Sequence, residues 1–174
     1  MISKKAISSL ILIIAAGSAL AAQATAKQKI AAYYTKSDAL TLKKDIPGLT
    51  KLLTDVTTSD FISIEKPNQK GVSAKKTRAE TLAVIAQVIP LVDKFDKAES
   101  HIDKYTANSG SYVVTVTTSV AITTKPDPKG NVHKLLDVAK SDDTWVKVGA
   151  DWKLKSSKTL SEKMTENGQP FTGG

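Results

Sequence analysis

A short run near the middle of the chain holds residue types that could move a proton. Alternation along a strand places His101, Asp103 and Tyr105 on one face, and a histidine beside a carboxylate is a common proton-transfer pair. Ile102 lies on the other face, and if it faces the core, the polar trio is the solvent face of an edge strand. The sequence leaves both arrangements open, with Tyr105 as a candidate for lining a ligand cavity.

Aromatic side chains and one further aspartate complete the set of candidates. Tyr33 and Tyr34 lie in a helical pattern, where packing in the core is the alternative to ligand binding. Trp145 and Trp152 flank a predicted hairpin turn, where they line a ligand cavity, fill the core or form a dimer face. Asp60 stands at the start of a predicted strand, a place where aspartate often caps or turns the backbone.

Metal and nucleotide sites are not indicated by the sequence. Two isolated histidines and the lack of cysteine argue against zinc, and Asp142-Asp143 is too short for a calcium loop. The chain has no phosphate-binding loop, dinucleotide fingerprint or serine nucleophile elbow. We therefore predict neither a metal nor a cofactor.

The beginning of the chain is typical of a cleavable secretory signal peptide that ends at residue 24. Lys4 and Lys5 precede an uncharged apolar run, and two Ala-x-Ala sites end at Ala21 and Ala24. The apolar run is short for a membrane-spanning helix, which needs about 20 residues. We expect a secreted or periplasmic protein, cleaved after Ala21 or Ala24, with no stable membrane anchor afterwards.

Composition indicates a protein that is held together by its core and not by disulfides. The chain has 174 residues and no cysteine, so neither a disulfide nor a cysteine-linked lipid anchor can form. Its net charge is +8, and removal of Lys4 and Lys5 with the signal peptide leaves +6. Of the 25 basic residues only Arg78 is arginine, the side chain suited to bidentate phosphate contacts. We therefore do not expect nucleic acid as a partner.

Helical spacing dominates the first half of the predicted mature chain. We predict one helix over 26–44 and a second helix that begins after its N-cap residue, Asp45. A short strand follows over 61–65, and a polar loop over 66–73 leads to a third helix. Pro90 ends or bends this third helix.

In the second half of the predicted mature chain, the residue pattern is typical of β-strands. We predict strands over 101–106 and 112–124, the latter a β-branched run that disfavours a helix. The segment 132–148 is either one strand or two strands separated at 140–142, and a further strand covers 152–155. Because the connecting turns are short, an antiparallel meander is expected.

This order of elements resembles the cone fold of nuclear transport factor 2-like (NTF2-like) proteins. The segment 49–55 before Asp60-Phe61 is similar to the second helix leading into the first strand of that superfamily. Residues 144–154, with a tryptophan strand, a Gly/Asp turn and Trp-Lys-Leu, resemble the closing hairpin of its SnoaL-like branch. The resemblance covers most of 26–160 and implies an α+β fold with three N-terminal helices packed on a curved, mainly antiparallel sheet.

An enzyme of this fold needs a pocket base and hydrogen-bond donors. Ketosteroid isomerase combines an aspartate base with a tyrosine and a neutral aspartate as donors. The resemblance places Tyr33 or Tyr34 on the helix that supplies the pocket tyrosine and Asp60 near the base, although the residues around Asp60 do not match that enzyme. The strand over 112–124 holds no aspartate for the third role. Cyclases of the SnoaL type use a His/Asp pair, which the run from His101 loosely resembles.

We expect a non-catalytic domain that binds a small, partly apolar molecule or a partner protein. One alternative is an isomerase, cyclase or dehydratase that uses Asp60 or the pair His101 and Asp103 as its base. The other is a structural homodimer formed through the outer face of the sheet. The sequence predicts one domain over 25–165 and a flexible tail over 166–174.

Overall fold

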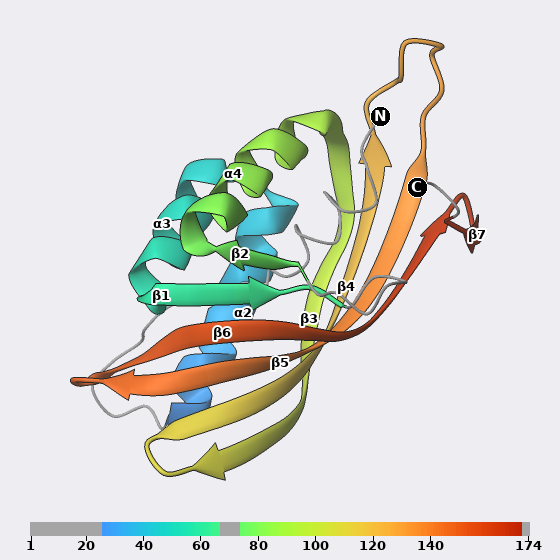
Figure 1. The fold of residues 1–174 in the computed structure, drawn as a ribbon. Helices are drawn as coiled ribbons and strands as arrows, with labels where there is room; N and C mark the ends of the chain where they lie inside the picture. The colour runs from blue at the N-terminus through green and yellow to red at the C-terminus, as the bar shows by residue number, and fades with distance from the viewer. Residues whose placement is uncertain (1–25, 67–73, 172–174) are drawn as a thin grey trace.

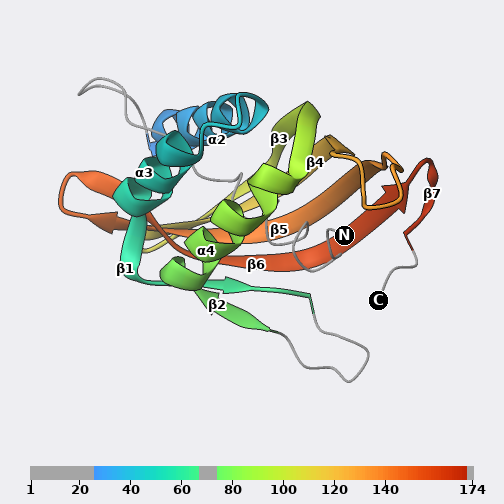
Figure 2. The ribbon, with the colours of Figure 1, turned by 90° about the horizontal axis from the view of Figure 1, so that it is seen from above.

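Three helices cover one face of a strongly curved sheet in the computed structural model of the chain (Figures 1 and 2). The structure describes residues 26–66 and 74–171. The predicted signal peptide, nearly all of the predicted loop over 66–73 and the last three residues of the predicted tail lie outside the described residues.

The helices and strands follow one another in this order: α2 (Ala26–Leu42), α3 (Ile46–Val56), β1 (Thr57–Ile64), β2 (Lys75–Thr77), α4 (Arg78–Val88), the 3-10 turn η1 (Ile89–Leu91), β3 (Val92–Asn108), β4 (Ser111–Thr124), β5 (Lys134–Val148), β6 (Asp151–Glu166) and β7 (Gln169–Pro170). Two helices precede the first strand and α4 follows β2, so the three helices are not all N-terminal as the resemblance implies. None of the helices in the described ranges is both long and apolar enough to span a bilayer.

The strands form one mixed sheet in the order β2-β1-β6-β5-β4-β3, and β7 pairs with the C-terminal end of β6. The strands β3 to β6 form the predicted antiparallel meander, and β1 runs parallel to β6. The α+β class and the mainly antiparallel sheet predicted from the sequence are therefore confirmed.

Two helices begin where local sequence signals predict them. The Asp45 side chain accepts a hydrogen bond of 2.8 Å from the backbone N–H of Gly48, and Pro47 lies in the first turn of α3. Thr77 caps α4 in a capping box, in which the Glu80 carboxylate accepts a bond of 2.7 Å from the backbone N–H of Thr77. These caps satisfy backbone donors that have no partner inside the helix.

We expect Gly48→Ala to destabilise the protein, although alanine normally favours a helix over glycine by about 1 kcal/mol. A Cβ on Gly48 would lie 2.5 Å from Oδ2 of Asp45 and 2.8 Å from Cδ2 of Leu40. The capping carboxylate must therefore move, and loss of an N-cap costs about 0.5–2 kcal/mol. Urea denaturation measures the change, and a stabilised Gly48→Ala variant would contradict the prediction. In an Asp45→Ala background the same substitution should cost less, because the clashing carboxylate is gone.

Strand β3 begins well before the strand predicted over 101–106. Its buried side chains Val92, Phe95 and Ala98 are three residues apart, because register shifts against β4 fall between these positions. Each bulge adds one residue to β3 and breaks the alternation by which a strand is detected. For that reason the apolar spacing in the first half of β3 does not indicate a strand.

The described residues after 148 form longer strands than the sequence predicted. β5 is a single continuous strand, which settles the alternative left open for 132–148, and β6 extends far past the predicted strand over 152–155. Asn167 and Gly168 both have positive φ, which a two-residue type I′ hairpin turn requires. After this turn, β7 pairs with β6. The described part of the predicted flexible tail is therefore a small hairpin.

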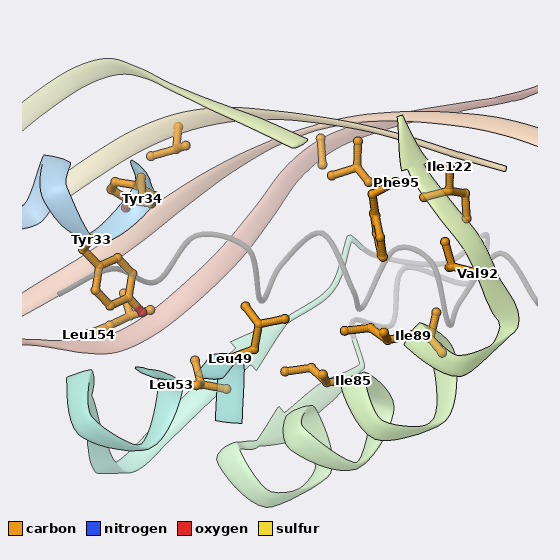
Figure 3. Close-up of a cluster of buried hydrophobic side chains, with 14 of the residues drawn as sticks. Tyr33, Tyr34, Leu49, Leu53, Ile85, Ile89, Val92, Phe95, Ile122 and Leu154 are labelled. Carbon is orange, nitrogen blue, oxygen red and sulfur yellow. The ribbon is translucent and has the colours of Figure 1, made fainter. Parts of the chain in front are cut away.

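One continuous core fills the space between the helices and the sheet. Figure 3 shows Ile85 and Ile89 pointing toward Phe95 at one end of this core and Tyr33 close to Leu154 at the other. All five side chains are at most 4% exposed. In the described part of the chain, the space between the helices and the middle of the sheet is therefore filled by side chains.

Candidate functional site

A cleft of about 590 Å³ lies where α2, α3 and the β5–β6 hairpin meet. Figure 1 shows these three elements at the same end of the molecule. A volume of roughly 300–1,000 Å³ is typical of small-molecule sites. The apolar part of its lining consists of Ile30, Tyr33, Leu40, Leu52, Val56, Trp145 and Trp152. The charged part consists of Lys29, Lys36, Lys51, Lys153, Asp45, Asp55 and Asp151.

Helix α2 presents one stripe of side chains to the cleft. Lys29, Tyr33, Lys36 and Leu40 are separated by four, three and four residues, which keeps them on one side of a helix. Both lysines therefore lie on the same side of α2 as the tyrosine between them. This arrangement follows directly from the sequence once the helix is known to face the hairpin.

Tyr33 forms part of the inner wall of the cleft. Its ring meets the Trp145 ring edge-on, with centroids 4.5 Å apart and an interplanar angle of 90°. Within the described residues its buried hydroxyl has no hydrogen-bond partner, which is an unfavourable state for a polar group. Burial, and to a smaller extent the charge of Asp143, raises the pKa of Tyr33 well above its ordinary value. The hydroxyl therefore stays protonated, and it is buried behind the surface of the cleft.

The neighbouring Tyr34 is fully committed to a buried network behind that wall. Its hydroxyl donates to Oδ2 of Asp143 at 2.8 Å and accepts a bond from Nε1 of Trp145 at 3.2 Å. The other oxygen of Asp143 accepts bonds from the hydroxyls of Ser141 and Ser157. Neither Tyr34 nor Asp143 lines the cleft. The network therefore holds the indole ring of Trp145 in place.

The carboxyl group of Asp143 has a raised pKa. Burial raises its pKa to about 6, although hydrogen bonds from Ser157, Tyr34 and Ser141 act in the opposite direction. In ketosteroid isomerase, a tyrosine and a neutral aspartate are the hydrogen-bond donors to the bound molecule. Here the protein itself satisfies both groups, so neither is free to donate to a bound molecule.

The predicted ligand-binding residues fall into two groups. Tyr33, Trp145 and Trp152 line the cleft, whereas Tyr34 and Tyr105 do not. The hydroxyl of Tyr105 donates to the backbone carbonyl of Lys27 at 3.1 Å, which fastens the start of α2 to β3. Trp145 contacts the two helix tyrosines, and the Trp152 ring packs 5.1 Å from the ring of Tyr112, so the two indoles have separate partners.

The three predicted catalytic candidates lie outside the cleft. The side chain of Asp60 is 66% exposed on β1, with its carboxylate 3.8 Å from Lys155. The His101 side chain is 83% exposed, and its Nε2 lies 4.0 Å from the Asp103 carboxylate. Asp103 is engaged elsewhere, because it accepts a bond of 2.8 Å from Thr117.

The predicted common face of His101, Asp103 and Tyr105 does not form. A register shift in β3 falls between Ile102 and Lys104, so Tyr105 pairs with the buried Val114 and packs toward the core. His101 and Asp103 are directed to the outer face of the sheet. The sequence left the orientation of Ile102 open, and the structure places it opposite buried Val116, on the inner face.

Sequence reasoning missed Asp143 and the lysines of the cleft. It sought the second aspartate of a Tyr/Asp set in the strand over 112–124, whereas the aspartate lies in the next strand, β5. The alternation of Ser141, Asp143 and Trp145 on one face of β5 was the available signal. Helical spacing through Lys29 and Lys36 was the signal for the lysines.

Residues of the 125–133 loop line a second hollow of about 350 Å³. Figure 1 shows this loop between β4 and β5, at the opposite end of the long strands from the β5–β6 hairpin. His133 stands in its wall, with Nδ1 in contact with the Glu166 carboxylate and Nε2 3.7 Å from that of Asp127. Phe171 closes one side. Both ring nitrogens of the histidine thus face carboxylates of the chain itself, which fasten the loop to the end of β6.

No family model matches this chain, and no curated protein matches its sequence significantly. Solved structures with the same arrangement are found at low identity. The Kfla4162 protein of Kribbella flavida aligns with a TM-score of 0.58 at 13% identity, over 75% of this chain and 87% of that one. An NTF2-like protein of unknown function from Prochlorococcus aligns with a TM-score of 0.52 at 15% identity, over 79% and 94%.

A protein of Novosphingobium aromaticivorans that is provisionally identified as a scytalone dehydratase aligns with a TM-score of 0.51 at 14% identity, over 79% of this chain and 87% of that one. This chain therefore has the NTF2-like fold, as its sequence predicted. At these identities the likeness concerns the fold alone, and this fold carries many unrelated functions.

Proposed function

We propose that this chain is an exported, non-catalytic NTF2-like domain that binds a small, partly apolar molecule in the cleft between α2, α3 and the β5–β6 hairpin. The observation that carries the proposal is the aromatic wall of Tyr33, Trp145 and Trp152 in a cleft of about 590 Å³. Flat apolar side chains with a few polar groups are the usual lining of small-molecule sites.

The acidic groups of the cleft support binding without catalysis. Asp45 is occupied as the N-cap of α3, and the Asp55 carboxylate pairs with Lys51 at 2.6 Å. Asp151 lies exposed at the hairpin turn. An enzyme of the isomerase or dehydratase kind needs an acid or base within hydrogen-bond reach of its substrate, and the predicted bases Asp60 and His101 lie outside this cleft.

Protein purified without denaturation from its own compartment is expected to retain a small molecule that native mass spectrometry detects. The intact mass in the same spectrum should correspond to a chain that starts at Ala22 or Thr25. A chain that still starts at Met1 would contradict export.

A matched pair of variants locates the bound molecule. Val56→Phe adds bulk to a residue of the cleft lining and should abolish retention. Leu136→Phe adds bulk to a side chain on β5 that is 39% exposed, away from the cleft, and should leave retention unchanged. Retention that survives Val56→Phe in a folded protein would contradict the proposed site.

A further inference from the structure

The cleft combines its aromatic wall with lysines whose charges are incompletely neutralised. Lys51 pairs with Asp55 at 2.6 Å. Lys29 and Lys153 instead donate to backbone carbonyl oxygens, those of Ala150 and Asp55, and a carbonyl carries no formal charge to cancel theirs. Lys36 makes no ion pair with any carboxylate of the described residues.

The aspartates of the cleft do less to attract a cation than their number suggests. The carboxylate of Asp45 faces the N-terminus of α3, where the backbone N–H of Gly48 and the helix dipole already balance it. The charge of Asp55 is balanced by Lys51. Asp151 remains as the one lining carboxylate without such a balance among the described residues, against Lys29, Lys36 and Lys153. The cleft therefore favours an anion.

The positive charges and the aromatic surface are adjacent along α2. Lys29 and Lys36 are seven residues apart, which separates their Cα atoms by about 10 Å along the helix axis. Tyr33 lies between them on the same side of the helix and lines the cleft. A molecule whose flat part packs against Tyr33 and Trp145 would thus have a lysine ammonium within reach of its polar end.

We propose that the cleft selects a small organic anion, namely a carboxylate carried on a flat apolar body. This inference rests on the binding function proposed above and adds the class of ligand. Lys36 provides the anchoring charge, Lys29 and Lys153 add to the positive field at the rim, and the wall of Tyr33 and Trp145 accepts the apolar body. Lysine suits a single carboxylate here, because its ammonium acts as a flexible point charge and not as a planar fork.

Three probes of one shape and different charge test the class of ligand: 2-naphthoate, neutral 2-naphthamide and cationic 2-naphthylmethylammonium. Binding is followed by tryptophan fluorescence and by NMR shifts of the two indole N–H groups. We expect 2-naphthoate to bind about fivefold more tightly than 2-naphthamide at low salt, and the cation to bind weakest. The preference should shrink at 1 M salt, where the Debye length falls to about 3 Å.

Two lysine variants with the same change in net charge test the anchor. Lys36→Gln should weaken 2-naphthoate about threefold and leave 2-naphthamide unchanged, because only the anion uses the charge. Lys163→Gln removes an exposed lysine near the other end of β6 and should change neither probe. An equal loss in both variants would mean that net charge alone attracts the anion, and would overturn the role of Lys36.

The results of these experiments distinguish a failure of the proposed class of ligand from a failure of the proposed small-molecule binding. Equal or tighter binding of 2-naphthamide, or a neutral molecule retained by the purified protein, would overturn the class of ligand and leave small-molecule binding intact. If no probe binds and Val56→Phe changes nothing in the retained material, both the class of ligand and the binding function are overturned.

Discussion

Replacement of Trp145 by alanine is expected to lower the free energy of unfolding by about 3–5 kcal/mol, the cost usual for a large buried aromatic side chain. The residue is 1% exposed and packs edge-on against Tyr33 and Tyr34. Its indole N–H donates to the Tyr34 hydroxyl, so truncation also removes one of the partners of a buried polar group. Urea denaturation followed by circular dichroism measures the loss.

Two variants distinguish the packing of Trp145 from its hydrogen bond. Trp145→Phe keeps an aromatic ring and loses the N–H donor, so we expect an intermediate loss of about 1–3 kcal/mol. Trp152→Ala removes the other indole of the same cleft, but this ring is only partly buried and should cost less than Trp145→Ala. An equal or larger cost for Trp152→Ala would contradict the larger contribution to stability that we assign to Trp145.

Asp143→Asn is expected to stabilise the protein relative to the parent chain above pH 7 and to have little effect near pH 3. The pKa of Asp143 in the folded protein is about 6, well above the ordinary value of an aspartate. The amide has nearly the same shape, and it can accept from Tyr34 while the two serine hydroxyls rotate to accept from its NH2 group. It avoids the cost of a buried charge.

The stabilisation expected for Asp143→Asn above pH 7 follows from the linkage between protonation and folding. The folded state holds the Asp143 proton up to about pH 6, whereas the unfolded state releases it near pH 4. The stability contributed by this group is therefore complete below about pH 4 and is lost as the pH rises through 6. A shift of about two pKa units corresponds to roughly 3 kcal/mol in the stability of the parent chain relative to Asp143→Asn.

Asp103→Asn is the matched control, because it should show the opposite trend. The Lys140 ammonium, at 2.8 Å, and the Thr117 hydroxyl hold the pKa of Asp103 below its ordinary value. Its contribution is present above about pH 4 and is lost as the pH falls through the lowered pKa. Denaturation curves from pH 3 to pH 8 compare the variants, and parallel trends for Asp143→Asn and Asp103→Asn would contradict the assignment of a raised pKa to Asp143.

The helices were predictable because their signals are local. Asp45 and Pro47 mark the start of α3, and the apolar spacing of its inner face needs no knowledge of distant residues. The hairpin at Asn167 and Gly168 was predictable in principle, since Asn-Gly is the preferred pair for this turn, and it was nevertheless assigned to a flexible tail. The bulged first half of β3 was not, because its register depends on β4.

The residues of the candidate site were likewise predictable only in part. Sequence patterns identified the aromatic residues Tyr33, Trp145 and Trp152, since large aromatic side chains near a turn or on a helix stripe line either a core or a cavity. They could not tell these residues from Tyr34 and Tyr105, whose partners come from elements distant in the sequence: Tyr34 bonds to Asp143 on β5, and Tyr105 bonds to the backbone of Lys27 on α2. Adjacent tyrosines on one helix thus take different roles: one at the cleft wall, one in the network behind it.

The sequence by itself determined the order of the helices and the longer strands, the fold class and the identity of the aromatic candidates, because these depend on side-chain spacing and on caps within a few residues. It did not reveal the short strands β2 and β7. Only the tertiary structure decided that His101 and Asp103 face outward and that Asp143 is buried beside Tyr34. Strand register sets these positions, and one bulge reverses the direction of every side chain after it. Register is a property of two paired strands, so no pattern within one strand reveals it.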